Sequence, residues 1–135
     1  MTDPSIQPDE LVTNSDLLKQ FLELWKMAPS PKGEAAAWIV RITVPELTYK
    51  LINRKTNADS HVNLGNCHPS AIAQVHTHYH GLDPKPSTWG DQDKHDWYTA
   101  TRCKVPVYVL SSFAIWKVLP GGKTPTLIKV ANKWF

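Results

Sequence analysis

The histidines of this chain are concentrated in one region. All six fall between positions 61 and 95, and three of them, His76, His78 and His80, follow an apolar run. A loop comes next, and Asp91 stands thirteen residues after His78. Two imidazoles and one carboxylate are the protein ligands that a catalytic zinc typically takes, with water in the fourth position. The pattern therefore predicts a Zn²⁺ site formed by His76, His78 and Asp91.

The geometry of a strand explains how two of these histidines could share an ion. Residues 71–75 are predicted to form a strand that runs directly into the histidines. Residues two apart on a strand project from the same face, so His76 and His78 can converge on one metal. A metal held there lowers the pKa of its water toward neutrality and supplies a nucleophile. His80 is predicted to lie beside the site or in solvent, with a ligand role as the alternative.

Hydrolysis at such a site also needs a base that takes a proton from water and passes it to the leaving group. Glu34 is the candidate, because it follows Gly33 at the head of a small, apolar and β-branched segment over residues 35–44. That segment is predicted to be a buried strand. Glu46, beside Pro45, is the alternative base. The non-catalytic interpretation of Glu34 is a solvated carboxylate at a strand end.

The remaining patterns predict a mixed α+β domain, with a β-sheet flanked by helices. Asn14 can cap a helix that ends by Ala28, in which leucine and aromatic residues recur at intervals of three and four. Asp91 would begin a second helix. The expected elements are strands over residues 47–52, 105–110, 114–118 and 127–130, and a helix over residues 91–102. Residues 1–30 are predicted to form an N-terminal arm and helix, and residues 31–135 the domain that carries the site.

Composition excludes several classes of protein. With 135 residues, 41% of them hydrophobic, the chain can bury a core and is not expected to be disordered. The formal charge of +3 is spread without a basic stripe, which argues against a nuclease or any nucleic-acid partner. No apolar run is long enough for a membrane span, and the polar start is unlike a signal peptide, so a soluble protein is expected. Cys67 and Cys103 could pair, bind metal or simply be buried.

These residues resemble a known family. An upstream glutamate, a His-Thr-His triplet and a later block ending in aspartate are similar to the JAMM/MPN metallopeptidase motif: Glu34, His76-Thr77-His78 and Pro86-Ser87-Thr88-Trp89-Gly90-Asp91. Residues 76–117 are most similar to the JAMM-like domains at the ends of bacterial polymorphic toxins. The resemblance implies a cytidine-deaminase-like sheet with an extra N-terminal helix. It also implies that Glu34 is the general base, that His76, His78 and Asp91 bind Zn²⁺, and that Ser87 stabilises the oxyanion.

The spacing departs from the common motif in one place. Twelve residues separate His78 from Asp91, where the family has ten, and Ser87 lies four residues before Asp91 rather than three. A second register, with His78 and His80 as the pair and Thr88 as the oxyanion residue, keeps the common spacing. The first register is preferred because its two histidines flank a threonine directly after the apolar strand. Ser87 and Thr88 remain alternatives for the oxyanion.

The resemblance implies a zinc-dependent metallopeptidase that cleaves a peptide or isopeptide amide bond, as a bacterial toxin or effector domain. The alternative is a catalytically silent MPN-like scaffold module. Retention of the glutamate, both histidines and the aspartate favours the enzyme. The expected partners are a peptide, protein or peptidoglycan-peptide substrate and an immunity protein, with export by a specialised secretion system. The sequence leaves open the scissile bond, the oligomeric state and whether the chain is a fragment of a larger toxin.

Overall fold

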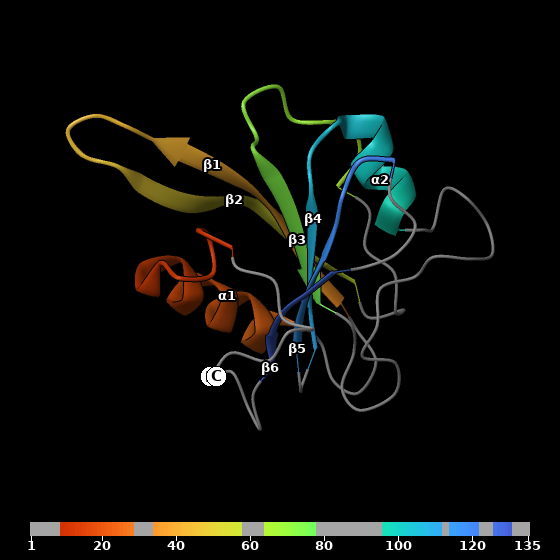
Figure 1. Ribbon diagram of the computed structural model, residues 1–135, viewed down its shortest axis with the longest axis horizontal. Helices are drawn as coiled ribbons and strands as arrows, with labels where there is room; N and C mark the ends of the chain where they lie inside the picture. Colours follow the sequence, from red (N-terminus) through yellow and green to blue (C-terminus); the bar gives the residue numbers. More distant parts are fainter. Residues whose placement is uncertain are drawn as a thin grey trace.

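The computed structural model describes residues 9–28, 34–57, 64–77, 96–111, 114–121 and 126–130. Within these ranges the chain forms two helices and six strands (Figure 1). In chain order they are α1 (Ser15–Met27), β1 (Glu34–Ile42), β2 (Thr48–Asn57), β3 (Ala73–Thr77), α2 (Asp96–Cys103), β4 (Val107–Leu110), β5 (Ala114–Val118) and β6 (Thr126–Val130). In the same ranges, neither helix is long and apolar enough to cross a membrane.

The six strands form one mixed sheet in the order β2-β1-β3-β4-β5-β6. β3 and β4 are parallel, and every other neighbouring pair is antiparallel. Parallel neighbours need a crossover connection, and α2 lies in the segment that joins β3 to β4. The α+β class predicted from the sequence is therefore confirmed.

The two helices cover opposite faces of this sheet. On β4, Tyr108 and Leu110 belong to the core that α1 completes, whereas Val107 and Val109 pack with Ala100 of α2. Successive residues of a strand point to opposite faces, so α1 and α2 must lie on different sides. Figure 1 shows the same arrangement, with the sheet between the two helices.

α1 forms as its sequence predicts. The side chain of Asn14 accepts a hydrogen bond from the backbone N–H of Leu17 at 2.9 Å, which caps the first turn. The buried stripe of the helix packs on the sheet and consists of Leu17, Phe21, Leu24 and Trp25. Phe21 contacts the ring of Tyr108 with 6.2 Å between ring centroids. One hydrophobic core thus joins α1 to the sheet. The domain boundary predicted at residue 30 lies outside the described residues.

β2 is longer than the strand predicted over residues 47–52. It continues to Asn57, which pairs with Glu34 at the start of β1. The added residues are mostly polar and exposed, so their own pattern gave no strand signal. Backbone pairing with β1 extends β2, because each added pair satisfies backbone groups whatever the side chains are. Leu47, predicted as the first residue of this strand, is instead exposed in the β1–β2 turn.

Candidate active site at the end of β1 and β3

Two of the predicted site residues lie in the described part of the structure. Glu34 is the first residue of β1, and His76 is the fourth residue of β3. The other residues predicted for the site lie outside the described residues: His78, Ser87, Thr88 and Asp91, together with the alternative ligand His80.

The strand register brings Glu34 and His76 together. β1 and β3 are antiparallel, and Ala36 lies directly opposite His76. Glu34 is two residues from Ala36 and therefore projects from the same face as His76, one step nearer the end of the sheet. Such diagonal neighbours have Cα atoms roughly 7–8 Å apart, within reach of long side chains. Glu34 and His76 thus share one face and one end of the sheet.

Both residues are buried. Glu34 is 9% exposed and His76 is 8% exposed. Carboxylates are almost never kept at this depth unless they are paired or serve a site, because removing a charge from water is costly. The interpretation of Glu34 as a solvated strand-end residue is therefore wrong. The alternative base, Glu46, is exposed in the turn beyond the other end of β1, roughly 25 Å along the strand.

The position within the fold is one where sites commonly form. His76 lies near the carboxyl end of β3 and pairs with Val109 near the carboxyl end of the parallel strand β4. Its face is the one against which α2 packs, because Val109 belongs to the α2 core. In open α/β sheets, ligands bind outside the carboxyl ends of parallel strands. The chain leaves β3 at Thr77, so His78 follows this end directly in sequence.

Thr77, between the two predicted histidine ligands, holds the strands in register. Its hydroxyl accepts the backbone N–H of Ala35 at 3.0 Å, and the residue is fully buried. The bond joins the residue after Glu34 to the residue after His76, so it sets where these two side chains stand. Sequence reasoning missed this role. The available signal was alternation: a threonine between two histidines of one face must point into the opposite face, where its hydroxyl needs a partner.

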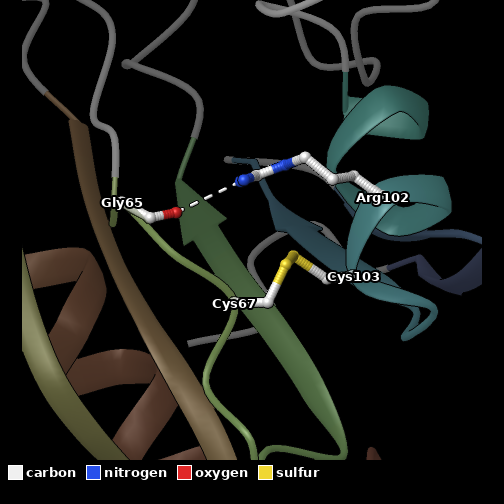
Figure 2. The surroundings of a disulfide bond; sticks show 4 residues. All are labelled: Gly65, Cys67, Arg102 and Cys103. Atoms are coloured by element: carbon white, nitrogen blue, oxygen red, sulfur yellow. Dashed lines mark hydrogen bonds between the residues drawn. A yellow bond between two sulfur atoms is a disulfide. The ribbon is translucent and has the colours of Figure 1, made fainter.

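A disulfide between Cys67 and Cys103 ties the loop before β3 to the end of α2, with 5.4 Å between the Cα atoms. The guanidinium of Arg102 donates a hydrogen bond to the carbonyl of Gly65 at 3.1 Å across the same junction. Figure 2 shows both links side by side. Of the three uses that the sequence left open for the cysteines, pairing is the one found. A disulfide sulfur cannot serve as a thiolate ligand, so the alternative that these cysteines bind a metal is wrong.

The donor chemistry of the described residues fits a zinc ion. His76 supplies a buried imidazole, a ligand that zinc commonly takes in proteins, and the buried carboxylate of Glu34 on the same face could accept a proton from a water bound to the metal. Among the described residues there is no group of three or more histidine, cysteine, aspartate or glutamate side chains that could hold a metal. Two of the three predicted ligands fall outside those ranges, so the predicted ligand set stays a prediction.

No family model, curated protein or solved structure matches this chain. The resemblance to JAMM-like domains consequently rests on the motif residues and their spacing.

Proposed function

We propose that this protein is a zinc-dependent metallopeptidase-like hydrolase that cleaves a peptide or isopeptide amide bond. The observation that carries the proposal is the placement of Glu34 and His76, both buried, on one face and at one end of adjacent strands. A base and a metal ligand must be close neighbours for such a reaction, and these two residues are 42 positions apart in the sequence.

Each residue of the proposed site has a role that follows from the chemistry of its side chain. His76, with His78 and Asp91, would hold the zinc, which when bound would make a water molecule acidic enough to act as a nucleophile near neutral pH. Glu34 would accept a proton from that water and return it to the leaving amine. Ser87 or Thr88 would donate a hydrogen bond to the oxyanion, a contribution typically worth ~10²–10³ in rate. Thr77 would keep Glu34 and His76 in register through its bond to Ala35.

A role as a bacterial toxin or effector, with an immunity protein as partner, belongs to the same proposal. The Cys67–Cys103 disulfide supports the part that concerns export, because disulfides persist mainly outside the reducing cytosol. The burial of Glu34 favours an enzyme over a silent scaffold module. In an enzyme, a buried carboxylate on the same face as a metal-binding histidine would serve as the proton acceptor.

The experiment that tests the proposal is Glu34→Gln, which keeps the size of the side chain and removes the base. We expect about one zinc per chain and an unchanged melting temperature, while hydrolysis falls by at least ~10²-fold. Hydrolysis is measured with a pool of quenched fluorescent peptides, and growth inhibition is measured with the protein directed to the cytoplasm or to the periplasm. Glu46→Gln is the matched control and should behave as wild type, since Glu46 lies beyond the opposite end of β1.

Two results would count against the proposal. Full activity of Glu34→Gln would remove the assigned base. A wild-type protein that contains zinc but neither cleaves peptides nor inhibits growth, and that is indistinguishable from Glu34→Gln in every assay, would instead support the scaffold alternative.

A further inference from the structure

The loop over residues 64–70 borders the candidate site on the side of β1. The ring of His68 lies beside the indole of Trp38, with 6.5 Å between the ring centroids. Trp38 pairs with Gln74 on β3, two residues before His76, and therefore stands on the same face as the predicted zinc ligand. Trp38 is 2% exposed. The loop thus meets the sheet beside the candidate site, one step back along β3.

α2 borders the site on the other side, over β4. Its Ala100 packs with Val109, which pairs with His76 on β3. Cys103, the last residue of α2, is bonded to Cys67 of the loop, so the disulfide connects the two borders (Figure 2). β3 lies between β1 and β4 in the sheet. The disulfide therefore joins the segments that stand on either side of the strand that carries His76.

The loop has no anchor in the hydrophobic core. None of residues 64–70, all of which the structure describes, is buried. The guanidinium of Arg102 links the loop to α2 through the carbonyl of Gly65, but this hydrogen bond is exposed, and water can compete for both groups. A segment with few buried contacts and exposed hydrogen bonds opens at low cost. The disulfide is thus the link between loop and helix that water cannot replace.

α2 has further anchors on the sheet. Ala100 is fully buried, and the hydroxyl of Thr101 accepts a hydrogen bond from the N–H of Gly121 at 2.7 Å. The carbonyl of Ala100 also accepts the N–H of Val105 at 3.2 Å. When the disulfide is broken, α2 should therefore stay on the sheet while the loop moves away from it.

The bond is open to thiol–disulfide exchange, because Cys67 and Cys103 are only partly buried. A thiolate of a small reductant attacks one sulfur, the bond between the cysteines breaks, and a mixed disulfide forms. A second thiol of the reductant then displaces the cysteine. In total, two reductant thiols become one disulfide, and the two electrons and two protons that they lose convert the cysteines to thiols. The thiol pool of a reducing cytosol is a reductant of this class.

We propose that the Cys67–Cys103 disulfide is a redox switch of the candidate site. The proposal rests on the hydrolase function proposed above and names the regulation of the same site. Reduction releases the loop over residues 64–70, so that water enters beside Trp38. The surroundings of a metal site control its access to solvent and its local dielectric, so hydrolysis becomes slower. The protein is most active in oxidising surroundings and least active where thiols are abundant.

Amide hydrogen exchange tests the release of the loop without depending on turnover. The oxidised protein is compared, well below its melting temperature, with protein reduced by a water-soluble phosphine, which becomes a phosphine oxide with oxygen from water. We expect residues 64–70 to exchange at least ~10-fold faster after reduction, while residues 15–27 of α1 and 99–103 of α2 keep their protection. Unchanged exchange in the loop overturns the proposal. Equally fast exchange in α1 also overturns it, because reduction would then unfold the whole protein.

Hydrolysis of the peptide pool is measured on the same samples. We expect reduction to lower the rate about tenfold, as the loss of groups around a metal site typically does. The rate should return when the phosphine is removed and oxidised glutathione re-forms the bond. A Cys67→Ser/Cys103→Ser double variant should show the low rate with and without reductant. Arg102→Ala is the matched control, because it removes the hydrogen bond to Gly65 and leaves the disulfide, and its oxidised form should hydrolyse as wild type does.

The outcomes separate this proposal from the hydrolase function. Equal hydrolysis by oxidised and reduced wild type, or a fully active double variant, overturns the switch and leaves the hydrolase standing. If neither form cleaves any peptide, the hydrolase function fails, and the exchange of residues 64–70 still decides whether reduction releases the loop.

Discussion

At the scale of single residues, His76 and Gln74 offer a matched comparison. They lie on the same face of β3, two positions apart, and each is 8% exposed. If His76 is a zinc ligand, His76→Ala should lower the metal content well below one zinc per chain. Gln74→Ala should retain the metal, although both truncations should cost a similar ~1–3 kcal/mol of stability. Elemental analysis and thermal unfolding of the two variants check this, and equal zinc in both would exclude His76 as a ligand.

Tyr108 carries a pH dependence that is unrelated to the site. It is 1% exposed, and its hydroxyl donates a hydrogen bond to a carboxylate oxygen of Asp9 at 2.8 Å. Burial, and next the bond to Asp9, raise the pKa of Tyr108 well above its ordinary value. The folded state therefore holds the phenolic proton more tightly than the unfolded state. This contribution to stability is complete below pH ~10, the unfolded pKa, and is lost progressively as the pH rises beyond it.

Tyr108→Phe tests that dependence. We expect the variant to lose ~1 kcal/mol at pH 8, because the hydrogen bond to Asp9 is gone, and to lose less stability than wild type between pH 9 and pH 11.5. Urea unfolding at several pH values measures both effects. If the free energies of unfolding of the two proteins change with pH in parallel, Tyr108 does not cause the loss of stability at alkaline pH.

At the scale of elements, Gln20 couples α1 to the edge of the sheet. Its side-chain amide donates to the carbonyl of Tyr49 and accepts from the N–H of Leu51, both at 2.8 Å. β2 is the last strand on its side of the sheet in the described residues, so its outer backbone groups lack a neighbouring strand. Gln20 satisfies two of them and thereby covers part of an edge that could otherwise pair with another chain.

Gln20→Ala should therefore destabilise the protein by ~1–3 kcal/mol and increase aggregation on mild heating. Lys19→Ala, an exposed position on the same helix, is the control and should change stability by less than ~0.5 kcal/mol. Urea unfolding and light scattering are the measurements. If Gln20→Ala is as stable as wild type, water replaces the two hydrogen bonds of the glutamine without loss of stability.

At the scale of the whole molecule, the disulfide closes a ring that contains most of the predicted site. Cys67 and Cys103 are 36 residues apart, and His76, His78 and Asp91 lie between them. A closed loop of this length limits the unfolded chain and should contribute ~3–4 kcal/mol to stability. We expect a reductant to lower the melting temperature of wild type markedly and to leave a Cys67→Ser/Cys103→Ser double variant unchanged. A wild type that melts alike with and without reductant would show that the bond adds no stability.

The sequence alone determined the local features of this protein. α1, β4 and β5 follow from short-range patterns: a capping residue, a buried stripe at intervals of three and four, and runs of β-branched residues. The candidate residues Glu34 and His76 were also found from the sequence, because their types and spacing resemble a motif. Each of these inferences needs only neighbours in the chain or a known pattern.

Tertiary structure decided what depends on distant partners. The length of β2, the bulge in its pairing with β1 between Ala36 and Trp38, and the burial of Glu34 were not predicted, and the pairing of Cys67 with Cys103 was one of three alternatives that the sequence left open. Each arises because a strand or loop must satisfy its backbone groups and fill space against segments far away in the sequence. A pattern within one segment does not indicate which distant segment will pack against it. For that reason the sequence could identify Glu34 as a candidate base and His76 as a candidate ligand, but only the strand register could place them on one face.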